Sequence, residues 1–509
     1  MKPRAILRST IQKPRPGGFA MIVAWLPRHR LLWPLVAALA LGGCAMMESQ
    51  GEKPLTAEIP AAAPRTLGVE TLASAEHKKM IALYGGEYRY PSAERFLNAI
   101  LVKLAKTGDS PANPYKVTIL NSPVINAFAL PPNKIYVTRG LLTLANDAAE
   151  VAAVMAHEIG HITAHHAMLR DEQERRAAVI TQAASVIQSR ERGQEVAAIE
   201  QRTIASFSRQ QEFDADQIGI RSMAKAGYDP YAAARFLNTM EEARALHAVE
   251  FGEAASAKPD LLATHPSTPA RIEHANAVAH EFGAPGIGTT DRTAYLAAID
   301  GMMYGDDPAD GAIRGRTFVH PRLHFVFQAP KGFVLENSAQ AVLGIKGGGI
   351  EALRLDSVRL TEETSLESYI DSGWIDGLLR SSIQPLEVNG MQALTAIARA
   401  GEWNFRIALI RFDSAVVYRM IFAIHNLDED SEKRFLASIE SFRHTTGDEA
   451  ARVRPSRIVV VTARSGDKAE TLATKMAIIN RPLENFELLN NLHATGPLRV
   501  GEHYKIVTE

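Results

Sequence analysis

Two histidines and one glutamate occur within the segment His157–His161, which reads His-Glu-Ile-Gly-His. Residues four apart share one face of a helix, so the two imidazoles can bind a single Zn²⁺ ion. Glu158 lies about 100° around the helix from His157, beside the metal, where its carboxylate can polarise a bound water. Because zinc lowers the pKa of such a water to roughly 7, the pattern indicates hydrolysis at neutral pH.

This chemistry requires the segment to lie inside a helix, and the flanking residues predict one. Asp147 is a favourable N-cap, and Glu150 follows three residues later, close to a capping box. Apolar side chains then recur at helical spacing and form a stripe for burial: Val151, Val154, Met155, Ile159 and Ile162.

A third zinc ligand is available downstream, in a run from about residue 199 to residue 226 that also has helical character. Glu212 can complete a set of two histidines and one glutamate that leaves a fourth position open. Asp216, one turn later, can accept the free N–H of a ligand imidazole and fix its tautomer. Taken alone, both acids would be interpreted as surface residues of an amphipathic helix. The upstream histidine pair favours the metal role.

Several segments surround the zinc helix in an order that is typical of one protease family. They are residues 126–131 (Asn-Ala-Phe-Ala-Leu-Pro), 135–137 (Ile-Tyr-Val), 140–142 (Gly-Leu-Leu), 212–216 (Glu-Phe-Asp-Ala-Asp) and 226–230 (Ala-Gly-Tyr-Asp-Pro). Together with the zinc helix they resemble the HtpX/BepA-type zinc metalloproteases, the gluzincin-like M48 peptidases, over about residues 67–279. The soluble periplasmic branch is the closer match, because no transmembrane helices flank the zinc helix.

The resemblance implies one Zn²⁺ per chain, with three ligands and a general base: His157, His161, Glu212 and Glu158. His165 continues the ligand face by one turn. With Glu212 available, we interpret His165 and His166 as residues that orient the ligands or pack beside them.

A further motif of the same branch is matched by residues 264–271 (Thr-His-Pro-Ser-Thr-Pro-Ala-Arg). In BepA-like proteins the histidine of this motif can take the fourth zinc position and displace the water. His265 is therefore a possible regulatory ligand, a latch that holds the enzyme off, since an imidazole binds zinc better than water does. Two alternatives stay open: His265 caps a turn before Pro266, or it contacts the transition state.

The region before the zinc helix predicts a small sheet. Residues 115–120 alternate weakly, and residues 127–130 and 134–137 flank a Pro-Pro-Asn connection that is typical of a hairpin. An exposed edge of this sheet could bind an extended peptide as an added strand and hold its scissile amide over the metal. The alternative is an ordinary core hairpin.

The N-terminal segment predicts export. Residues 28–30 are basic, residues 31–41 are apolar but too few to span a bilayer, and Leu-Gly-Gly precedes Cys44. This order resembles the lipobox of bacterial lipoproteins, which implies a signal peptide and a lipid on Cys44. Ala45, in place of an aspartate, implies the periplasmic face of the outer membrane. The alternative is a secretory signal with a chance cysteine, and Met21 is an alternative start.

The composition excludes nucleic acid as a partner and disulfides within the chain. With 56 basic and 57 acidic residues the net charge is −1, so the chain lacks the excess of positive charge that binding to nucleic-acid phosphates requires. Cys44 is the single cysteine. A chain with 46% hydrophobic and 22% charged residues is typical of soluble globular proteins.

We expect a multidomain chain: a mainly α zincin-type metalloprotease domain with a small sheet, then an α+β domain, then a small LysM-like βααβ module. The expected parts are a lipoprotein signal peptide (1–43), a tether (44–66), the zinc metalloprotease domain (67–282), a linker and helix (283–310), the α+β accessory domain (311–445) and the LysM-like module (457–509).

The two parts after the protease differ in pattern. Residues 311–445 alternate like strands in several segments, with helical stretches near 366–379 and 432–439, which favours a mainly antiparallel sheet. They lack the tetratricopeptide pattern that follows the protease in BepA. Residues 457–509 resemble a LysM module, which implies binding to the N-acetylglucosamine chains of peptidoglycan. The alternative is a module that packs against the protease.

The leading hypothesis is a zinc endopeptidase that acts on misfolded polypeptides in quality control of exported or outer-membrane proteins, anchored to the membrane through Cys44. Two others stay open. One is a chaperone or assembly scaffold whose zinc site is latched by His265, and the other is a structural lipoprotein tethered to peptidoglycan. A wall anchor would lose function when the residues after Ser456 are deleted, and a protease would lose cleavage when Glu158 is replaced.

Overall fold

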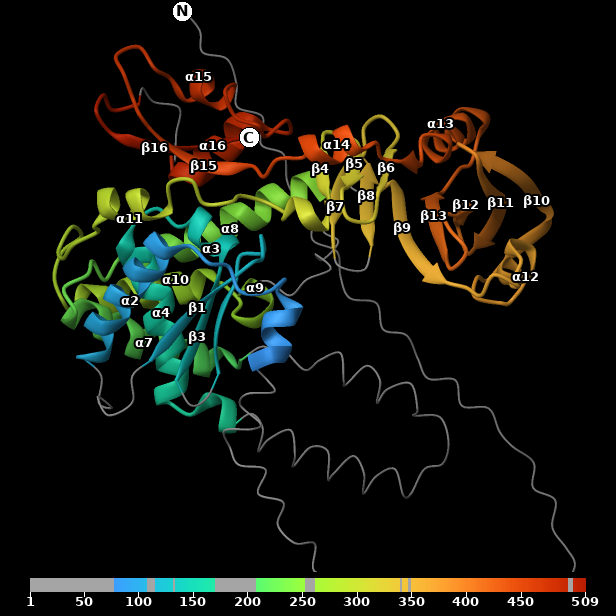
Figure 1. Cartoon of the computed structure of the whole chain (residues 1–509). Helices are drawn as coiled ribbons and strands as arrows, with labels where there is room; N and C mark the ends of the chain where they lie inside the picture. Colours follow the sequence, from blue (N-terminus) through green and yellow to red (C-terminus); the bar gives the residue numbers. More distant parts are fainter. Residues whose placement is uncertain are drawn as a thin grey trace, which may run out of the picture. The chain divides into compact units, whose positions relative to one another are not determined.

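The computed structural model describes residues 77–107, 115–130, 133–169, 207–251, 261–338, 341–346, 349–492 and 498–509 (Figure 1). All of them belong to one compact unit, Thr66–Glu509. The predicted signal peptide, Cys44 and the tether lie outside the described residues. Among the helices that are described, none combines the length and the apolar character that crossing a membrane requires.

The first part of the described chain is mainly helical, with a small sheet at its centre. Its strands are β1 (Lys116–Leu120), β2 (Ala127–Leu130) and β3 (Lys134–Thr138), in the order β1-β3-β2. β3 pairs in parallel with β1 and antiparallel with β2, so the predicted hairpin is confirmed and β2 forms one edge of the sheet. The helices are α2 (Pro91–Ala105), α3 (Arg139–Leu144), α4 (Ala148–Thr163), α7 (Arg209–Lys225), α8 (Ala232–Phe251), α9 (Leu261–Thr264), α10 (Pro269–His280) and α11 (Arg292–Ile299).

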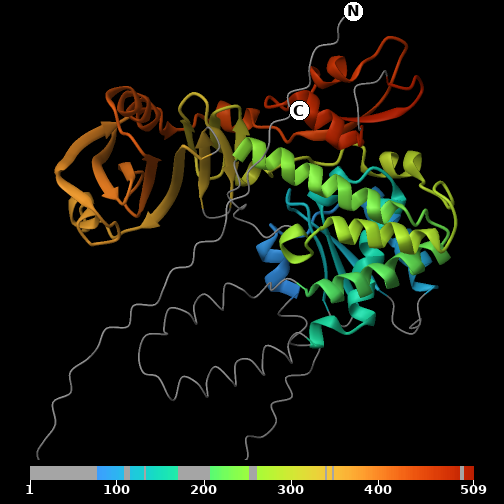
Figure 2. The same ribbon diagram turned by 180° about the vertical axis from the view of Figure 1, so that it is seen from behind.

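The zinc helix α4 lies in the middle of this part, and every residue from 148 to 161 is buried. A helix that is buried on all sides needs neighbours on all sides. Its neighbours are β2, α2, α7, α8 and α11. Seen from behind, the green to yellow-green helices α7, α8 and α10 lie in front of the small sheet (Figure 2). The zinc segment is therefore held by the whole core rather than by one contact.

The starts of α4 and α7 are fixed by side-chain caps. Asp147 accepts a hydrogen bond from the Glu150 amide at 2.9 Å, as predicted, but the Glu150 carboxylate accepts from the Asn146 amide instead of the N-cap amide. α7 begins later than its sequence pattern predicts, because Ser208 and Gln211 form a capping box there. The first part of the expected run, residues 199–206, lies outside the described residues.

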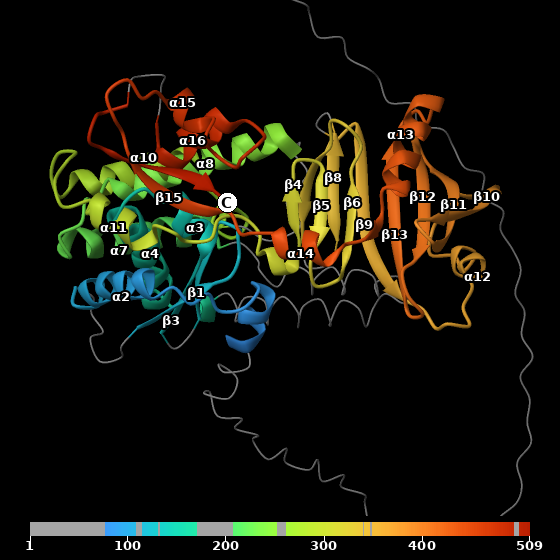
Figure 3. The same ribbon diagram turned by 45° about the horizontal axis from the view of Figure 1, so that its top comes forward.

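The second part is rich in β-structure, as expected. Its seven-stranded sheet is antiparallel throughout, in the order β10-β11-β12-β13-β9-β8-β7. Helices α12 (Leu366–Ile370) and α13 (Glu429–Glu440) cover opposite faces of this sheet (Figure 3). The strands are β7 (Val334–Asn337), β8 (Val342–Lys346), β9 (Glu351–Arg359), β10 (Leu378–Val388), β11 (Met391–Ala400), β12 (Trp403–Arg411) and β13 (Val416–Ile424).

A smaller four-stranded sheet, in the order β14-β6-β5-β4, accompanies it. Its strands and the two short helices beside them are β4 (Ala312–Arg314), β5 (Thr317–His320), β6 (Phe325–Gln328), β14 (Arg443–His444), η1 (Pro308–Asp310) and α14 (Gly447–Arg452).

The prediction of a helix over residues 366–379 is wrong beyond Ile370. Gly373 and Gly377 have φ angles of 84° and 70°, which an α-helix cannot contain. A Cβ on Gly377 would lie 1.8 Å from the Arg399 carbonyl oxygen, so the chain passes close to β11 before β10 begins.

The C-terminal module has the expected βααβ order: β15 (Arg457–Thr462), α15 (Ala469–Ala473), α16 (Pro482–Asn490) and β16 (His503–Thr508). β15 and β16 pair antiparallel. Ile458, Leu489 and Val507 of this module belong to the same buried apolar cluster as the core of the first part. The resemblance to LysM stays a prediction, since this element order is also compatible with a module that packs against the protease.

Candidate metal centre

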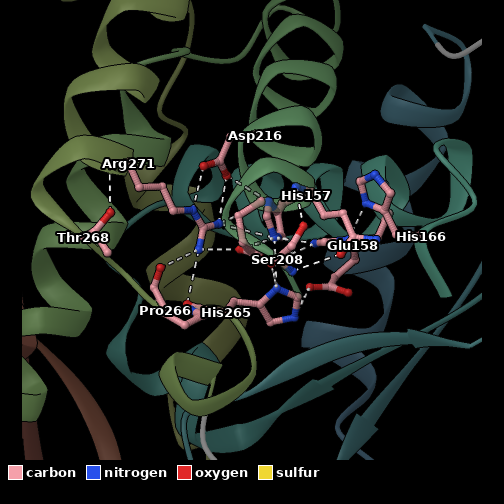
Figure 4. Close-up of polar contacts among 12 residues, drawn as sticks. His157, Glu158, His166, Ser208, Asp216, His265, Pro266, Thr268 and Arg271 are labelled. Atoms are coloured by element: carbon pink, nitrogen blue, oxygen red, sulfur yellow. Dashed lines mark hydrogen bonds and ion pairs between the residues drawn. The ribbon is translucent and has the colours of Figure 1, made fainter. Parts of the chain in front are cut away.

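Four buried side chains from three separate segments converge on one point. His157 and His161 come from α4, Glu212 from the first turn of α7, and His265 from the residue after α9. One ligand atom of each lies within 4.8 Å of the others. Figure 4 shows His157 and His265 facing each other, with Glu158 beside them.

Four of the distances between these atoms are close to those expected around a single tetrahedral ion. His157 Nε2 lies 3.0 Å from His161 Nε2 and 3.3 Å from His265 Nδ1. Glu212 Oε1 lies 2.9 Å from His265 Nδ1 and 3.4 Å from His161 Nε2. In a tetrahedral zinc site with bonds of roughly 2.0–2.1 Å, ligand atoms are about 3.3–3.4 Å apart. Three imidazole nitrogens and one carboxylate oxygen are also donors that zinc prefers.

Two glycines allow α4 and α7 to approach closely enough for Glu212 to reach the histidines. A Cβ on Gly160 would lie 2.8 Å from the Ala215 carbonyl oxygen. A Cβ on Gly219 would lie 2.9 Å from the His157 backbone nitrogen. Backbone atoms on both sides leave no room for a side chain, so the helix spacing depends on these two residues.

His161 and Glu212 are held in the protonation states that bind metal, whereas the Asp216 carboxylate and the charge of Glu212 raise the pKa of His157 against the effect of burial. Burial lowers the pKa of His161 to about 2, so its imidazole is neutral. Burial by itself would raise the pKa of Glu212, but hydrogen bonds with His161 and His265 outweigh it and hold that pKa well below its usual value. A neutral imidazole and an ionised carboxylate are the forms that coordinate zinc.

Asp216 occupies the position that the sequence predicts for it. Its Oδ1 lies 2.9 Å from His157 Nδ1, so His157 Nε2 is left to face the other ligands. Arg271 holds both oxygens of Asp216, with Nε to Oδ2 at 2.6 Å and Nη2 to Oδ1 at 2.9 Å. Although burial opposes it, the hydrogen bond from Arg271 lowers the pKa of Asp216 to about 2.

Arg271 also ties the His265 segment to α7. Its Nη1 lies 2.6 Å from Glu212 Oε2 and donates to the His265 and Pro266 carbonyl oxygens at 3.2 and 3.4 Å. Thr268 caps the helix that carries Arg271 (Figure 4). A single guanidinium therefore fixes the carboxylate ligand, the acid behind His157 and the backbone beside His265.

His161 has two further neighbours. His166 Nδ1 lies 2.9 Å from His161 Nδ1, which leaves His161 Nε2 for the metal. The Phe207 ring stacks on His161 with 4.0 Å between centroids and lies 5.2 Å from the His265 ring. His165, by contrast, is exposed at the end of the helix with φ of 54°.

Glu158 is only 2% exposed. Its Oε1 accepts no hydrogen bond from the residues that the structure describes, and it lies 3.6 Å from His265 Nε2. Burial raises the pKa of Glu158 above its ordinary value. A buried carboxylate with a free oxygen beside a metal centre is suited to take up and release a proton.

All the predicted site residues within the described chain lie in this cluster, and Cys44 lies outside the described residues. Sequence reasoning missed the roles of Arg271, Phe207 and the two glycines. Arg271 ends the motif of residues 264–271. Its positive charge was a signal that it could form ion pairs with the predicted acids Glu212 and Asp216. Helix-packing glycines and a stacking ring carry no such signal in a single sequence.

Residues 91–279 match peptidase family M48. The beta-barrel assembly-enhancing protease of Escherichia coli (strain K12) is 28% identical over 217 residues, which cover 41% of this chain and 43% of that protein. The mitochondrial metalloendopeptidase OMA1 of Arabidopsis thaliana is 33% identical over 153 residues, covering 30% of this chain and 29% of that protein. The chain thus spans less than half the length of these curated relatives.

Solved structures give weaker likenesses. The cyanobacterial PsbP of Synechocystis sp. PCC 6803 matches 26% of this chain and 94% of its own length, at 13% identity and a TM-score of 0.21. A score this low supports no argument about fold or function.

Proposed function

We propose that this chain, in which residues 91–279 form a peptidase family M48 domain, is a zinc-dependent endopeptidase of the bacterial cell envelope. Its role would be quality control of exported or outer-membrane proteins. The pathway is supported by similarity to a protease named for enhancing β-barrel assembly. One observation carries the chemistry: donor atoms of His157, His161 and Glu212 converge in a buried cluster beside the carboxylate of Glu158.

Each residue of the centre has a defined part in peptide hydrolysis. His157, His161 and Glu212 would hold one Zn²⁺ ion, which supplies a Lewis acid that polarises the peptide carbonyl and makes a bound water more acidic. Glu158 takes the proton of the attacking water and delivers it to the leaving amine. Asp216 and His166 keep the imidazoles in the tautomers that ligation needs.

The small sheet supplies a place for an extended substrate. β2 pairs only with β3 among the described strands, and it packs against α4. An unfolded polypeptide added along this edge would form backbone hydrogen bonds with β2, and such bonds do not depend on the substrate's amino-acid sequence. Such binding suits an enzyme that clears misfolded proteins of many kinds, and it holds the scissile amide near the metal centre.

The latch is supported by the position of His265, whose Nδ1 lies 2.9 Å from Glu212 Oε1 and 3.3 Å from His157 Nε2, where it would take a fourth ligand position. With four protein donors, no coordination position is left for water. His265 therefore acts as a latch that must leave before cleavage. The same observation favours a second function, a chaperone or assembly scaffold whose metal centre stays latched.

The location is proposed from the sequence. A lipid on Cys44 would anchor the chain to the periplasmic face of the outer membrane, and the tether would give the protease its reach. The C-terminal module would add affinity for peptidoglycan.

Replacement of Glu158 by Gln tests the activity. We expect the variant to bind zinc and fold normally but to cleave casein at least a hundredfold more slowly, since a general base contributes about 10²–10⁴-fold. Glu273→Gln changes an exposed acid on α10 and serves as the control. A Glu158→Gln protein that cleaves like the wild type would remove the hydrolase proposal. The wild type could instead fail to cleave casein but keep an unfolded porin from aggregating. If Glu158→Gln also kept the porin from aggregating, the chaperone function would be established.

A further inference from the structure

The two-stranded β15–β16 sheet of the C-terminal module packs on both of its faces. Alternate residues such as Tyr504 and Ile506 face the module's own helices. Ile458 and Val507 belong instead to the core that surrounds the zinc helix. A backbone hydrogen bond also joins the module to the first part of the chain, since the Ile458 amide donates to the Met302 carbonyl at 2.9 Å. The module is thus packed as part of the protease core, with β15 and β16 beside α11 and α16 beside α3 and α8 (Figure 3).

Lys505 lies on the protease-facing side of this sheet, and its side chain is fully buried. Its Nζ donates to three successive carbonyl oxygens: Thr143 at 2.9 Å, Leu144 at 3.0 Å and Ala145 at 2.7 Å. Burial lowers the pKa of Lys505 well below its usual value, but the three carbonyl acceptors match the three N–H donors of the charged ammonium form. The last carbonyls of a helix have no partner inside it, so Lys505 completes the C-terminal end of α3.

The module holds Lys505 rigidly in place. Asn490 of α16 accepts from the Lys505 amide at 2.7 Å and donates to the Lys505 carbonyl at 2.9 Å. Asn490 also donates to the Phe486 carbonyl at 2.9 Å, one turn back in its own helix. The ammonium group is therefore positioned by the fold of the module.

The three carbonyls lie immediately before α4, the helix that carries two of the ligands and Glu158. The same junction is held by Arg292, which donates to the Asn146 carbonyl at 2.8 Å, and by the Ala148 amide, which donates to the Thr290 carbonyl at 2.9 Å. Removing Lys505 would leave buried carbonyls without donors at the point where the zinc helix starts. A shift of this start would be transmitted along α4 to the ligands, because a helix moves as a rigid rod.

We propose that Lys505 is a positioning residue for the zinc helix and that residues 457–509 are an integral part of the protease. The inference rests on the proposed zinc site but concerns a different part of the chain. It has a direct consequence for deletion experiments. Removing everything after Ser456 would damage the metal centre, so loss of function in such a truncation does not identify a wall anchor.

Lys505→Met tests the proposal in the full-length chain, because Met has a similar length and no N–H donor. Lys475→Met, at an exposed lysine of the same module, is the matched control. We expect Lys505→Met to weaken zinc binding at least tenfold in chelator competition. We also expect kcat to fall on the order of ten- to a hundredfold with KM within twofold, as for a displaced catalytic group.

A folded Lys505→Met protein with zinc affinity and kcat within twofold of the wild type would overturn the proposal. An inactive wild type would count against the proposed protease function, while the zinc comparison would still decide the role of Lys505.

A second measurement does not depend on how well the variant folds. A recognition site for a sequence-specific protease is inserted after the exposed residue Ala451 in the full-length chain, which is then cut. We expect the C-terminal piece to co-elute with the rest of the chain in gel filtration. If the piece does separate, we expect the remainder to lose its zinc. A piece that separates while the remainder keeps its zinc and its activity would show that the module is a free appendage.

Discussion

Gly219 of α7 faces the backbone of His157 in α4 so closely that a Cβ on Gly219 would lie 2.9 Å from the His157 nitrogen. The neighbour is backbone, so it cannot rotate away, and a methyl group would push the two helices apart. Because Glu212 and His157 come from these two helices, their spacing sets the geometry of the metal centre.

We therefore expect Gly219→Ala to weaken zinc binding on the order of tenfold and to destabilise the fold by about 1–3 kcal/mol, as overpacking does. Chelator competition and urea unfolding measure the two effects. Gly447→Ala is the control, because nothing lies within 4 Å of a Cβ built there. Equal zinc affinities in the two variants would contradict the argument from helix spacing.

The assignment of the third ligand predicts the behaviour of Glu212→Ala. Removal of a direct ligand should weaken zinc binding more than a hundredfold. Replacing a residue that only hydrogen-bonds to a ligand typically weakens it 10–100-fold. Asp214→Ala removes an acid of the same helix that bonds to Gln210 at the surface, and it should keep its zinc. Metal content of both purified proteins is the measurement. Full zinc in Glu212→Ala would show that another acid is the ligand.

The latch predicts that His265→Ala is faster than the wild type. If His265 stabilises the closed arrangement by about 1.4 kcal/mol, its removal raises the cleavage rate about tenfold. His165→Asn changes an exposed histidine near the same site and should leave the rate unchanged. A casein assay under identical zinc concentrations compares them. A lower rate in His265→Ala would favour the alternative in which His265 contacts the transition state.

Glu150, next to the start of the zinc helix, predicts a pH dependence of stability. Burial, together with the charge of Asp147, raises the pKa of Glu150 from 4.5 to about 7. A group that binds its proton more tightly in the folded chain makes unfolding easier as pH rises through this interval. At about 1.4 kcal/mol per pH unit, the loss reaches up to about 3 kcal/mol by neutral pH.

Gln has the shape of a protonated Glu and does not titrate, so Glu150→Gln should gain stability relative to the wild type as pH rises from about 5 to about 8. Urea unfolding at several pH values measures the difference. Glu273→Gln, at an exposed position, should show no such trend. A difference that stays constant with pH would mean that Glu150 is already ionised at pH 5.

The elements near the metal centre could be predicted where local pattern decides structure. The N-cap Asp147, the apolar stripe of α4 and the pairing of β2 with β3 all follow from interactions between residues close in sequence. The predicted helix over residues 366–379 failed for a related reason. Its apolar spacing is helical, but Gly373 and Gly377 both have positive φ angles, and the chain at Gly377 passes close to β11.

The sequence by itself determined that His157 and His161 share one helix face with Glu158 beside them, because these residues stand at helical spacing. It also indicated Glu212, Asp216 and His265 through motifs whose order resembles one protease family. Tertiary structure alone decided that Arg271 joins two of these acids and that Lys505 supports the start of the zinc helix. Such contacts join residues far apart in the chain, and no local preference encodes them; they exist only once the core has packed.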